Sequence, residues 1–429
     1  MRKDSQALTA ALQKLEHLHP KKIDLGLSRI QHVLKKLGHP ERSLPPTVHI
    51  AGTNGKGSTT AFLRAMAEAQ DLRVHVYTSP HLVSFCERIV LANEMINEDV
   101  LLDILGRVQD ANEGQPLSFF EATTAAAFLA FSETPADILI LEVGLGGRFD
   151  ATNVIDHPAT VGITPIDYDH AEFLGRDLAG IAREKAGILK AHTPAFSAEQ
   201  SPIVRAVLET EAAKSKAKLK NMGEHFNAYA QQGRLIYEDD NTLLDLPLPA
   251  LRGAHQINNA GLAIALARAM LIDEAAIAKG LETASWPARL QALTSGALAE
   301  TAHASGAQLW LDGGHNPHAA RALASALAEL DATEPRPLTL IMGMLANKNA
   351  PGFLDAFEGL AHSLIAVPIS DHASLSPENL MDIAKGRGIK AYAADSLMDA
   401  LNLAMGQSKE PKRILICGSL YLAGEALAL

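Results

Sequence analysis

A short segment of small residues, Gly52–Ser58, is the first part of the chain whose residue types could do chemistry. It reads Gly-Thr-Asn-Gly-Lys-Gly-Ser and stands between an apolar stretch and a segment of helical periodicity. Small residues let backbone N–H groups turn toward an anion at a helix N-terminus. Lys56 would add a positive charge near bound phosphates, and a hydroxyl of Ser58 or Thr59 could reach a Mg²⁺ ion.

The spacing of this segment departs from the usual phosphate-binding loop. Ile50 stands where the pattern G-x-x-x-x-G-K-[ST] requires its first glycine, and Gly57 separates the lysine from Ser58. A plain glycine-rich turn is therefore the alternative. The strand–turn–helix context favours phosphate binding over that alternative.

Two further polar positions follow apolar runs. Glu142 comes directly after the run at 137–141, and His170 follows the run at 159–164. Open α/β sheets bind ligands at the carboxyl ends of their strands, so both side chains are expected at the same edge as Lys56. Either one alone could be a solvated strand end or a structural histidine. Together they predict a site for Mg²⁺ and a triphosphate, because a hard cation accepts carboxylate oxygen and tolerates imidazole.

Five other charged or titratable positions also have structural alternatives, and for Lys185 the structural alternative is the default. Lys185 on a predicted helix could be a solvated charge, and Arg148 and Asp150 could form a structural ion pair. Asp312 could bind a ribose hydroxyl and His315 a phosphate. The segment around these last two could equally cap the helix that follows it.

Alternating strands and helices are expected to position these residues. Strands are predicted at 47–50, 73–77, 137–141 and 159–164, and helices at 59–70, 98–109, 119–131 and 177–189. A second series of strands is predicted at 308–311, 338–341, 363–367, 390–393 and 413–416. This alternation predicts right-handed crossovers, a doubly wound N-terminal domain carrying the phosphate loop, and a smaller Rossmann-like α/β C-terminal domain. The expected limits are 1–288 and 289–429, with a β-excursion at 231–251.

Composition excludes several classes of protein. Of the 429 residues, 47% are hydrophobic and 20% charged, which excludes a disordered chain. The net charge of −11 disfavours nucleic acid as a partner. No apolar run approaches the roughly 18 residues of a membrane span. Cys86 and Cys417 have no metal-type spacing, so a reduced, cytoplasmic protein is expected.

Nine motifs occur in the order found in folylpolyglutamate synthases. They are AGTNGKGST (51–59), TSPHL (78–82), FFEATT (119–124), LEVGLGGRFDATN (141–153), DHAEFLG (169–175), REKAGILK (183–190), HQINNA (255–260), DGGHNPHAA (312–320) and ICGSLYLAGE (416–425). From about Ile23 to its end the chain resembles the bacterial bifunctional dihydrofolate synthase/folylpolyglutamate synthase family, which is related to the Mur peptide ligases.

The resemblance implies ATP-dependent amide synthesis. A carboxylate of dihydropteroate, or of a growing γ-glutamyl tail, takes the γ-phosphate of ATP to give an acyl phosphate, and the amine of L-glutamate then displaces phosphate. Phosphoryl transfer of this kind depends on positioned cations more than on covalent catalysis. A folylpolyglutamate synthase without dihydropteroate activity, a Mur-type ligase, a P-loop phosphotransferase and a non-catalytic nucleotide-binding protein are the alternatives.

The resemblance also implies a role for particular residues of this sequence. Catalysis falls to Lys56, Glu142, His170 and Lys185. ATP binding falls to Asn54, Gly55, Lys56, Gly57, Ser58, Thr59, Asn259, Arg289, Asp312 and His315. Two Mg²⁺ ions are expected on Ser58, Ser79, Glu142, His170 and Lys185, the lysine being carbamylated and so converted from a cation into an anion. Pteroate binding falls to Asp24, Leu25, Gly26, Leu27, Phe120, Glu121, Phe149, Asp150 and Ala151.

The same resemblance implies the partners. They are the small molecules dihydropteroate, tetrahydrofolates, L-glutamate and ATP, with a monovalent cation as a further expected cofactor. The nucleotide is expected in a cleft between the two domains, and the chain is expected to be a monomer.

Overall fold

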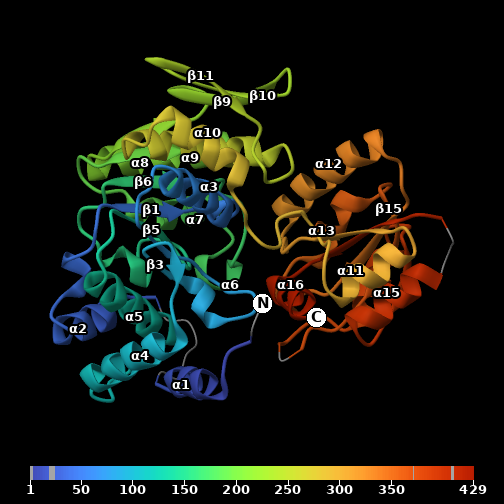
Figure 1. Ribbon diagram of the computed structural model, residues 1–429, viewed down its shortest axis with the longest axis horizontal. Coiled ribbons are helices and arrows are strands. Elements are labelled where there is room, and N and C mark those ends of the chain that lie inside the picture. Colours follow the sequence, from blue (N-terminus) through green and yellow to red (C-terminus); the bar gives the residue numbers. More distant parts are fainter. Residues whose placement is uncertain (1–2, 19–24, 371, 407–409) are drawn as a thin grey trace. The chain divides into compact units, whose positions relative to one another are not determined.

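The computed structural model describes residues 3–18, 25–370, 372–406 and 410–429, without the side chain at position 171. The described chain forms two compact units (Figure 1). The N-terminal unit comprises Lys3–Ala250 and Gln256–Ser285, and the C-terminal unit comprises Leu251–His255 and Trp286–Leu429. The expected pteroate-binding residue Asp24 lies outside the described residues.

An eight-stranded sheet forms the centre of the N-terminal unit, in the order β4-β3-β2-β5-β1-β6-β7-β8. The strands are β1 Thr47–Ala51, β2 Val74–Tyr77, β3 Ile89–Leu91, β4 Glu94–Met95, β5 Ile138–Glu142, β6 Thr160–Ile163, β7 Pro194–Ser197 and β8 Lys218–Asn221. Strands β2 to β8 in this order are parallel, and every residue of β1, β2, β5 and β6 is buried. Burial on both faces explains the apolar runs that predicted these strands.

The edge of this sheet differs from the prediction. Strand β3 pairs antiparallel with β2, and β4 pairs antiparallel with β3, so the sheet is mixed rather than wholly parallel. The predicted helix at 177–189 is also shorter: α7 ends at Lys185, and a single 3₁₀ turn, Ala186–Ile188, follows it. The break allows Gly187 to approach the backbone of Arg148, as described below.

Helices cover both faces of the sheet (Figure 1). One group packs its apolar residues against β2 and β5: α1 Gln6–Glu16, α2 Ser28–Lys36, α4 Glu98–Asn112 and α5 Phe119–Glu133. The remaining helices of the unit are α3 Lys56–Ala69, α6 Ala171–Leu174, α7 Leu178–Lys185, α8 Pro202–Ser215, α9 His255–Ala269 and α10 Glu274–Thr283. Helix α10 packs along α3, the helix that follows the glycine-rich loop.

The predicted β-excursion is a small antiparallel sheet. Its strands are β9 Phe226–Gln231, β10 Arg234–Asp239 and β11 Thr242–Pro247, so it begins five residues before the predicted 231. Alternate residues such as Leu235 and Tyr237 are buried, whereas Leu243 on the other face is exposed. This alternation is that of a sheet with one covered face.

The C-terminal unit contains a six-stranded sheet in the order β12-β13-β17-β14-β15-β16. Its strands are β12 Gln291–Ala292, β13 Gln308–Leu311, β14 Leu338–Met342, β15 Ala361–Ala366, β16 Lys390–Ala393 and β17 Arg413–Cys417. The helices are α11 Ala297–Ala304, α12 Pro317–Thr333, α13 Ala350–Leu354, α14 Pro377–Lys385, α15 Leu397–Gly406 and α16 Leu420–Ala428. Five strands are parallel and were predicted; β12 adds an antiparallel edge. The predicted α/β architecture is confirmed.

A short strap, Leu251–His255, belongs to the C-terminal unit although its neighbours in sequence belong to the other unit. The Arg252 guanidinium lies 5.6 Å from the centroid of the Trp310 ring. Gly253 has a φ of +107°, and a Cβ there would lie 2.7 Å from Cε1 of His255. Over the described residues the chain passes between the units three times.

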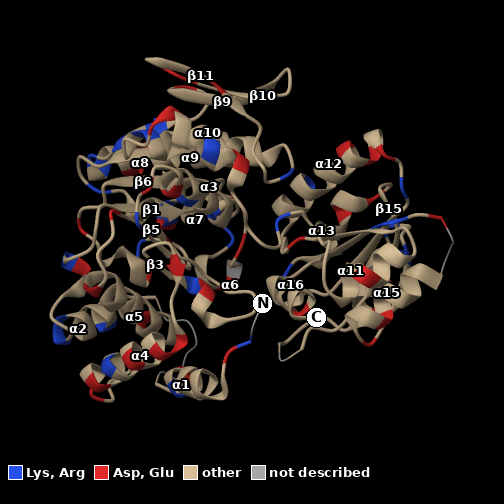
Figure 2. Cartoon of the chain, viewed as in Figure 1, with Lys and Arg blue, Asp and Glu red and all other residues tan. Residues whose placement is uncertain are grey.

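Acidic and basic residues are interspersed over both units (Figure 2). Within the described ranges, no helix combines the length and the apolar composition that crossing a membrane requires.

Candidate active site

The loop after β1 depends on two glycines. Gly52 has a φ of +150°, and a Cβ at this position would lie 1.8 Å from Oγ1 of Thr164. Gly55 has a φ of +91° at the N-cap of α3, where a Cβ would lie 2.4 Å from Oδ1 of Asn259. Both positions exclude other residues on conformational and steric grounds. The close approach of Asn259 brings one predicted nucleotide-binding residue to the loop that holds most of the others.

The same loop is attached to the segment after β6. The backbone N–H groups of Thr53 and Asn54 donate to the carbonyl oxygen of Pro165 at 3.0 and 3.2 Å. The Thr53 hydroxyl donates to the carbonyl oxygen of Asp167 at 2.9 Å. His170 lies three residues after Asp167, so these hydrogen bonds connect the glycine-rich loop to the segment that carries the histidine.

Two lysines converge on one carbonyl oxygen. Nζ of Lys56 lies 3.2 Å, and Nζ of Lys185 3.0 Å, from the carbonyl oxygen of Gly52. Nζ of Lys56 also lies 3.9 Å from Oε1 of Glu142, which is buried at the end of β5. The structure thus brings together three of the four residues expected to act in catalysis.

Burial, and to a lesser extent the positive charge of Lys56, lower the pKa of Lys185 to about 7, although Asp169 and Asp150 act in the opposite direction. A large fraction of the Lys185 side chain is therefore a neutral amine at pH 7. A neutral, desolvated amine is a nucleophile, whereas an ammonium group is not.

The hydroxyl groups at the start of α3 have different environments. Nε2 of Gln256 donates to Oγ of Ser58 at 3.3 Å, and Nδ2 of Asn259 donates to Oε1 of Gln256 at 3.0 Å. Oγ1 of Thr59 is buried and has no hydrogen-bond partner in the described structure. Gln256 was not predicted as a site residue, although it stands three positions before Asn259 and so on the same face of α9.

The other expected metal ligands lie at the same sheet edge. Ser79 follows β2, which pairs with β5 so that Tyr77 lies beside Leu141, next to Glu142. His170 has a φ of +50°, and its Nε2 lies 3.9 Å from Oδ2 of Asp169.

The donor atoms at this edge suit a hard divalent cation. They are the carboxylate of Glu142 and the hydroxyls of Ser58 and Ser79. The imidazole of His170 follows three residues after Asp167, to which the glycine-rich loop is hydrogen-bonded. In the part of the chain that the structure describes, no three His, Cys, Asp or Glu side chains form a metal-binding group. Magnesium usually takes one or two carboxylates and completes its shell with phosphate oxygens and water, so these residues fit a cation carried by a nucleotide.

The glycine-rich loop 144–148 fixes the end of α7. A Cβ at Gly147 would lie 2.7 Å from the carbonyl oxygen of Glu184, and a Cβ at Gly187 would lie 2.4 Å from Cα of Arg148. The N–H of Arg148 donates to the Glu184 carbonyl oxygen at 2.8 Å. Backbone packs directly on backbone here, which sets the position of Lys185 at the end of the helix.

The suggested ion pair between Arg148 and Asp150 is wrong. Nη2 of Arg148 instead lies 2.9 Å from Oε2 of Glu211. Asp150 is buried and accepts hydrogen bonds from the N–H of Leu145 at 2.8 Å and from the N–H and hydroxyl of Thr152 at 3.0 and 2.5 Å. The Asp150 carboxylate therefore holds the glycine-rich loop in its bend.

A buried histidine completes this network. Nε2 of His49 lies 2.9 Å from Oγ1 of Thr152, whose hydroxyl donates to Asp150, so His49 carries its proton on Nε2. Burial, and to a lesser extent the charge of Lys190, lower the pKa of His49 to about 3.

This pKa predicts sensitivity to acid. His49 stays neutral in the fold but binds a proton below about pH 6.5 when the chain unfolds, so its contribution to stability is complete above pH 6.5 and is lost progressively toward pH 3. Each pKa unit is worth about 1.4 kcal/mol. His49→Gln keeps a donor for Thr152 but does not titrate. The free energy of unfolding, measured by urea titration from pH 7 to 4, should fall less steeply in this variant. Parallel curves for the two proteins would contradict the prediction.

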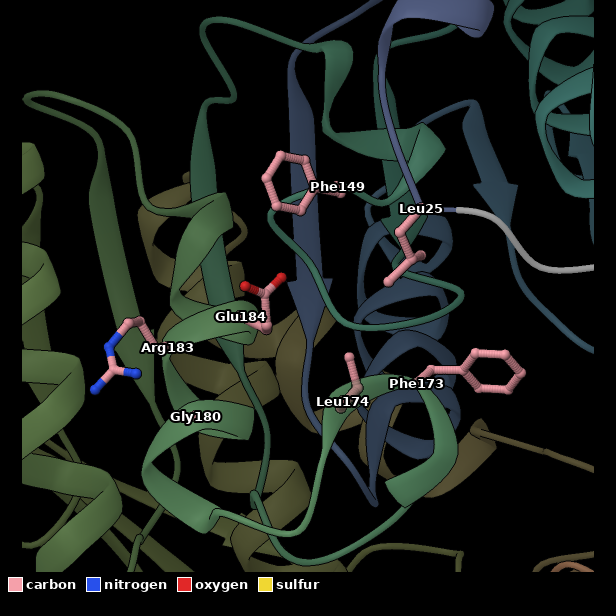
Figure 3. A pocket seen from close by; sticks show the side chains of 7 residues that line it. All are labelled: Leu25, Phe149, Phe173, Leu174, Gly180, Arg183 and Glu184. Atoms are coloured by element: carbon pink, nitrogen blue, oxygen red, sulfur yellow. The ribbon is translucent and has the colours of Figure 1, made fainter.

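A cavity of about 350 Å³ lies beside the glycine-rich loop (Figure 3). It brings together Leu25 and Phe149, both expected in the pteroate site. Its other lining residues were not predicted: Phe173, Leu174, Gly180, Arg183 and Glu184. Figure 3 shows Glu184 pointing toward Phe149, whereas Arg183 extends away from Leu25. Leu25 and Phe149 are far apart in sequence, and nothing in the local pattern of α6 and α7 indicated that these helices would line a cavity with them.

The remaining expected pteroate residues have structural partners. The Phe120 ring packs on Gly144, where a Cβ would lie 2.4 Å from its Cζ, and Ala151 is buried. Oε2 of Glu121 accepts from Nε of Arg29 at 3.0 Å and from the N–H of Ser118.

The second carboxylate oxygen of Glu121, Oε1, is buried and has no hydrogen-bond partner in the described structure. A buried acceptor of this kind is one that a bound N–H donor would satisfy. Gly26 and Leu27 precede α2, which carries Arg29, so the Arg29–Glu121 pair links their segment to α5.

In the C-terminal unit, Asp312 follows β13 and has a fixed orientation. Its Oδ2 accepts from the N–H of Leu290 and its Oδ1 from the N–H of Gly314, both at 2.7 Å. Nη1 of Arg289 donates to the carbonyl oxygen of Ala288 at 2.9 Å. The structure therefore places Arg289 and Asp312 on adjoining segments of one turn.

The alternative of a helix cap is correct for a neighbour of His315 rather than for His315 itself. Oδ1 of Asn316 accepts from the N–H of Ala319 at 2.9 Å and so caps α12. Nδ1 of His315 lies 3.0 Å from the carbonyl oxygen of Gly313.

His255 was not predicted as part of this group. Burial lowers its pKa, and the charges of Asp312, Arg289 and His318 also act on it. The strap therefore brings a histidine to the two expected nucleotide-binding residues of its own unit.

Comparison with known proteins agrees with this geometry. Residues 50–267 match the Mur ligase middle domain, and residues 299–420 match the Mur ligase glutamate ligase domain. The fold and the phosphate loop thus define an ATP-dependent ligase of the Mur type.

Individual relatives specify the class further. Dihydrofolate synthase/folylpolyglutamate synthase of Escherichia coli (strain K12) is 32% identical over 98% of this chain and 94% of that protein. The structure of E. coli FolC in complex with DHPP and ADP has a TM-score of 0.88 and 30% identity, covering 100% of this chain and 98% of that one. A bifunctional folylpolyglutamate synthase/dihydrofolate synthase with Mn, AMPPNP and L-glutamate bound has a TM-score of 0.86 and 30% identity, with 100% and 98% coverage. The chain belongs to the dihydrofolate synthase/folylpolyglutamate synthase family.

Proposed function

We propose that this enzyme adds L-glutamate both to 7,8-dihydropteroate and to the γ-carboxylate of tetrahydrofolates, at the expense of ATP. The observation that carries the proposal is the convergence of Lys56 and Lys185 on the Gly52 carbonyl, beside Glu142. Relatives named for both activities, and one structure with a nucleotide analogue, a metal and L-glutamate bound, support it.

The residues of the loop would hold the phosphates. The N–H groups at the start of α3 would bind the phosphate anion at the positive end of the helix, and Lys56 would offset the charge that develops during phosphoryl transfer. Transfer of the γ-phosphate to the substrate carboxylate gives an acyl phosphate and ADP. Attack by the amine of L-glutamate then forms the amide and releases phosphate, with one proton lost from the amine.

Glu142, Ser58, Ser79 and His170 are the residues that would hold Mg²⁺. The bound ion would supply charge neutralisation and orientation of the phosphate oxygens. Glu142 stands 3.9 Å from Lys56, so a single carboxylate can serve both the lysine and the cation. Two magnesium ions and a monovalent cation belong to the proposal.

Lys185 would act as a carbamate. Its neutral amine attacks the carbon of CO₂ and loses a proton, which forms an N–C bond and an anion. The low pKa of Lys185 supplies the neutral amine, and the anion would relieve the repulsion from Lys56. The carbamate would add an oxygen donor to the expected metal ligands.

The remaining assignments complete the proposal. Residues 1–288 would form the ATP- and pteroate-binding domain, and residues 289–429 would form the glutamate ligase domain. Asn259, Arg289, Asp312 and His315 would contact the nucleotide. The enzyme would act as a cytoplasmic monomer on small molecules.

The test of this function is phosphate release with ATP, Mg²⁺ and L-glutamate, with dihydropteroate and tetrahydrofolate offered in parallel. Turnover with both folates is expected. Turnover with tetrahydrofolate alone would restrict the enzyme to polyglutamylation. Silence with both, in folded protein that binds ATP, would overturn the assigned substrates.

A further inference from the structure

A fully buried amide lies beside the expected metal-binding hydroxyl. Gln256 and Ser58 are each about 1% exposed, and Nε2 of Gln256 donates to Oγ of Ser58 at 3.3 Å. Oε1 of Gln256 accepts from Nδ2 of Asn259 at 3.0 Å. The side chain is therefore held at both ends of its amide.

The hydrogen bonds fix the direction of the hydroxyl. A serine hydroxyl carries one hydrogen and two lone pairs. The Gln256 N–H occupies one lone pair, which leaves the other lone pair of Ser58 for a cation. Asn259 occupies the Gln256 carbonyl, so the amide presents its NH₂ group, and not its oxygen, to Ser58.

The network closes around the start of α3. Oδ1 of Asn259 lies so near Gly55 that a Cβ there would be only 2.4 Å away. Gly55 is the N-cap of α3, and Ser58 stands three residues after it. Gln256 and Asn259 are likewise three residues apart, in the first turns of α9. The first turns of α3 and α9 are therefore in contact through the side-chain amides of Gln256 and Asn259.

We propose that Gln256 is a positioning residue that orients the Ser58 hydroxyl for the metal–nucleotide complex. The proposal rests on the proposed function, because it assigns Ser58 to the cation. It adds a residue that makes no expected contact with a substrate and acts only through Ser58.

The consequence is a selective loss of affinity for the metal–nucleotide complex. Gln256→Met preserves length and removes both hydrogen bonds. A neutral hydrogen bond contributes on the order of 1 kcal/mol, or about fivefold in a binding constant. We expect the dissociation constant of Mn²⁺·ADP, measured by Mn²⁺ electron paramagnetic resonance on the full-length protein, to rise about fivefold.

A double-mutant cycle separates positioning from general destabilisation. In a Ser58→Ala background, Gln256→Met should have no further effect on Mn²⁺·ADP affinity, because the hydroxyl it orients is gone. The matched control is Asn221→Leu, which removes another buried amide of the same unit, one that donates to Glu209 at 3.1 Å. The control should leave Mn²⁺·ADP affinity unchanged even if the Tm falls.

The outcomes are distinct from those of the substrate assay. Unchanged Mn²⁺·ADP affinity in Gln256→Met, or an equal loss in the Ser58→Ala background, overturns the proposal whichever folate the enzyme uses. If Gln256→Met does not fold, Gln256→Asn retains a buried amide one methylene too short to bridge both partners, and should give the same loss. The KM of the Gln256→Met variant for the folate should equal that of the unsubstituted enzyme.

Discussion

Lys56→Ala is expected to abolish glutamate-dependent ATP turnover, lowering kcat by at least about 10³-fold, because phosphoryl transfer relies on positioned positive charge. Lys56 is largely buried and contacts both the Gly52 carbonyl and Glu142. Water that enters the space left by its side chain would therefore compensate poorly for the lost positive charge. Phosphate release with ATP, Mg²⁺, L-glutamate and tetrahydrofolate measures the loss. Glu142→Ala should have a comparable effect, because it removes the carboxylate expected to bind the cation.

The control is another lysine of the same unit. Lys190 is partly buried and has a lowered pKa, but it lies near His49 and outside the assigned site. Lys190→Ala should keep turnover near that of the unchanged enzyme. Circular dichroism should show that all three variants are folded. Normal turnover in Lys56→Ala would remove the phosphate-loop assignment altogether.

Lys185→Ala is expected to lose most activity and to recover part of it when acetate is added. If the lysine acts as a carbamate, a small carboxylate can occupy the space left by the side chain and supply the missing anion. Acetate up to high millimolar concentrations, with chloride at matched ionic strength, provides the measurement. Acetate should raise kcat several-fold in this variant and chloride should not.

Two results would argue against the carbamate. Full activity of Lys185→Ala without any additive would show that no anion is needed at this position. Equal recovery of Lys56→Ala in acetate would show a general salt effect, because the charge lost at position 56 is positive. A shift of the recovery with carboxylate size is the further expectation, since Lys185 is buried.

Buried strands could be predicted from the sequence because burial on both faces leaves a local signature. Runs such as 138–142 and 338–342 are buried at every position and are apolar apart from Glu142 and Thr339, and they lie at the centres of the two sheets. Edge strands carry no such signature: β8 has exposed residues at Lys218 and Lys220. The β3–β4 hairpin is also short, which explains why the antiparallel edge escaped prediction.

Site residues could be predicted from the sequence where a charged side chain stands at or shortly after the end of a predicted strand. Lys56 and Glu142 meet because β1 and β5 are neighbours in a parallel register, which the strand order required. Gln256 was missed because a glutamine inside an apolar helix carries no local mark of its partner, 198 residues away. The opposite charges of Arg148 and Asp150 suggested an ion pair between them. The Asp150 carboxylate is instead hydrogen-bonded by the backbone N–H groups of Leu145 and Thr152.

Because of the strap Leu251–His255, the C-terminal unit is made of two separate segments of the sequence. A fragment beginning at Trp286 would contain every strand of its sheet but would lack Arg252 over Trp310 and Gly253 beside Ala326. Joining that fragment to a foreign partner would leave the Trp310 ring without its covering cation. Recombination between relatives would therefore preserve both units only if the exchanged piece carried residues 251–255 together with 286–429.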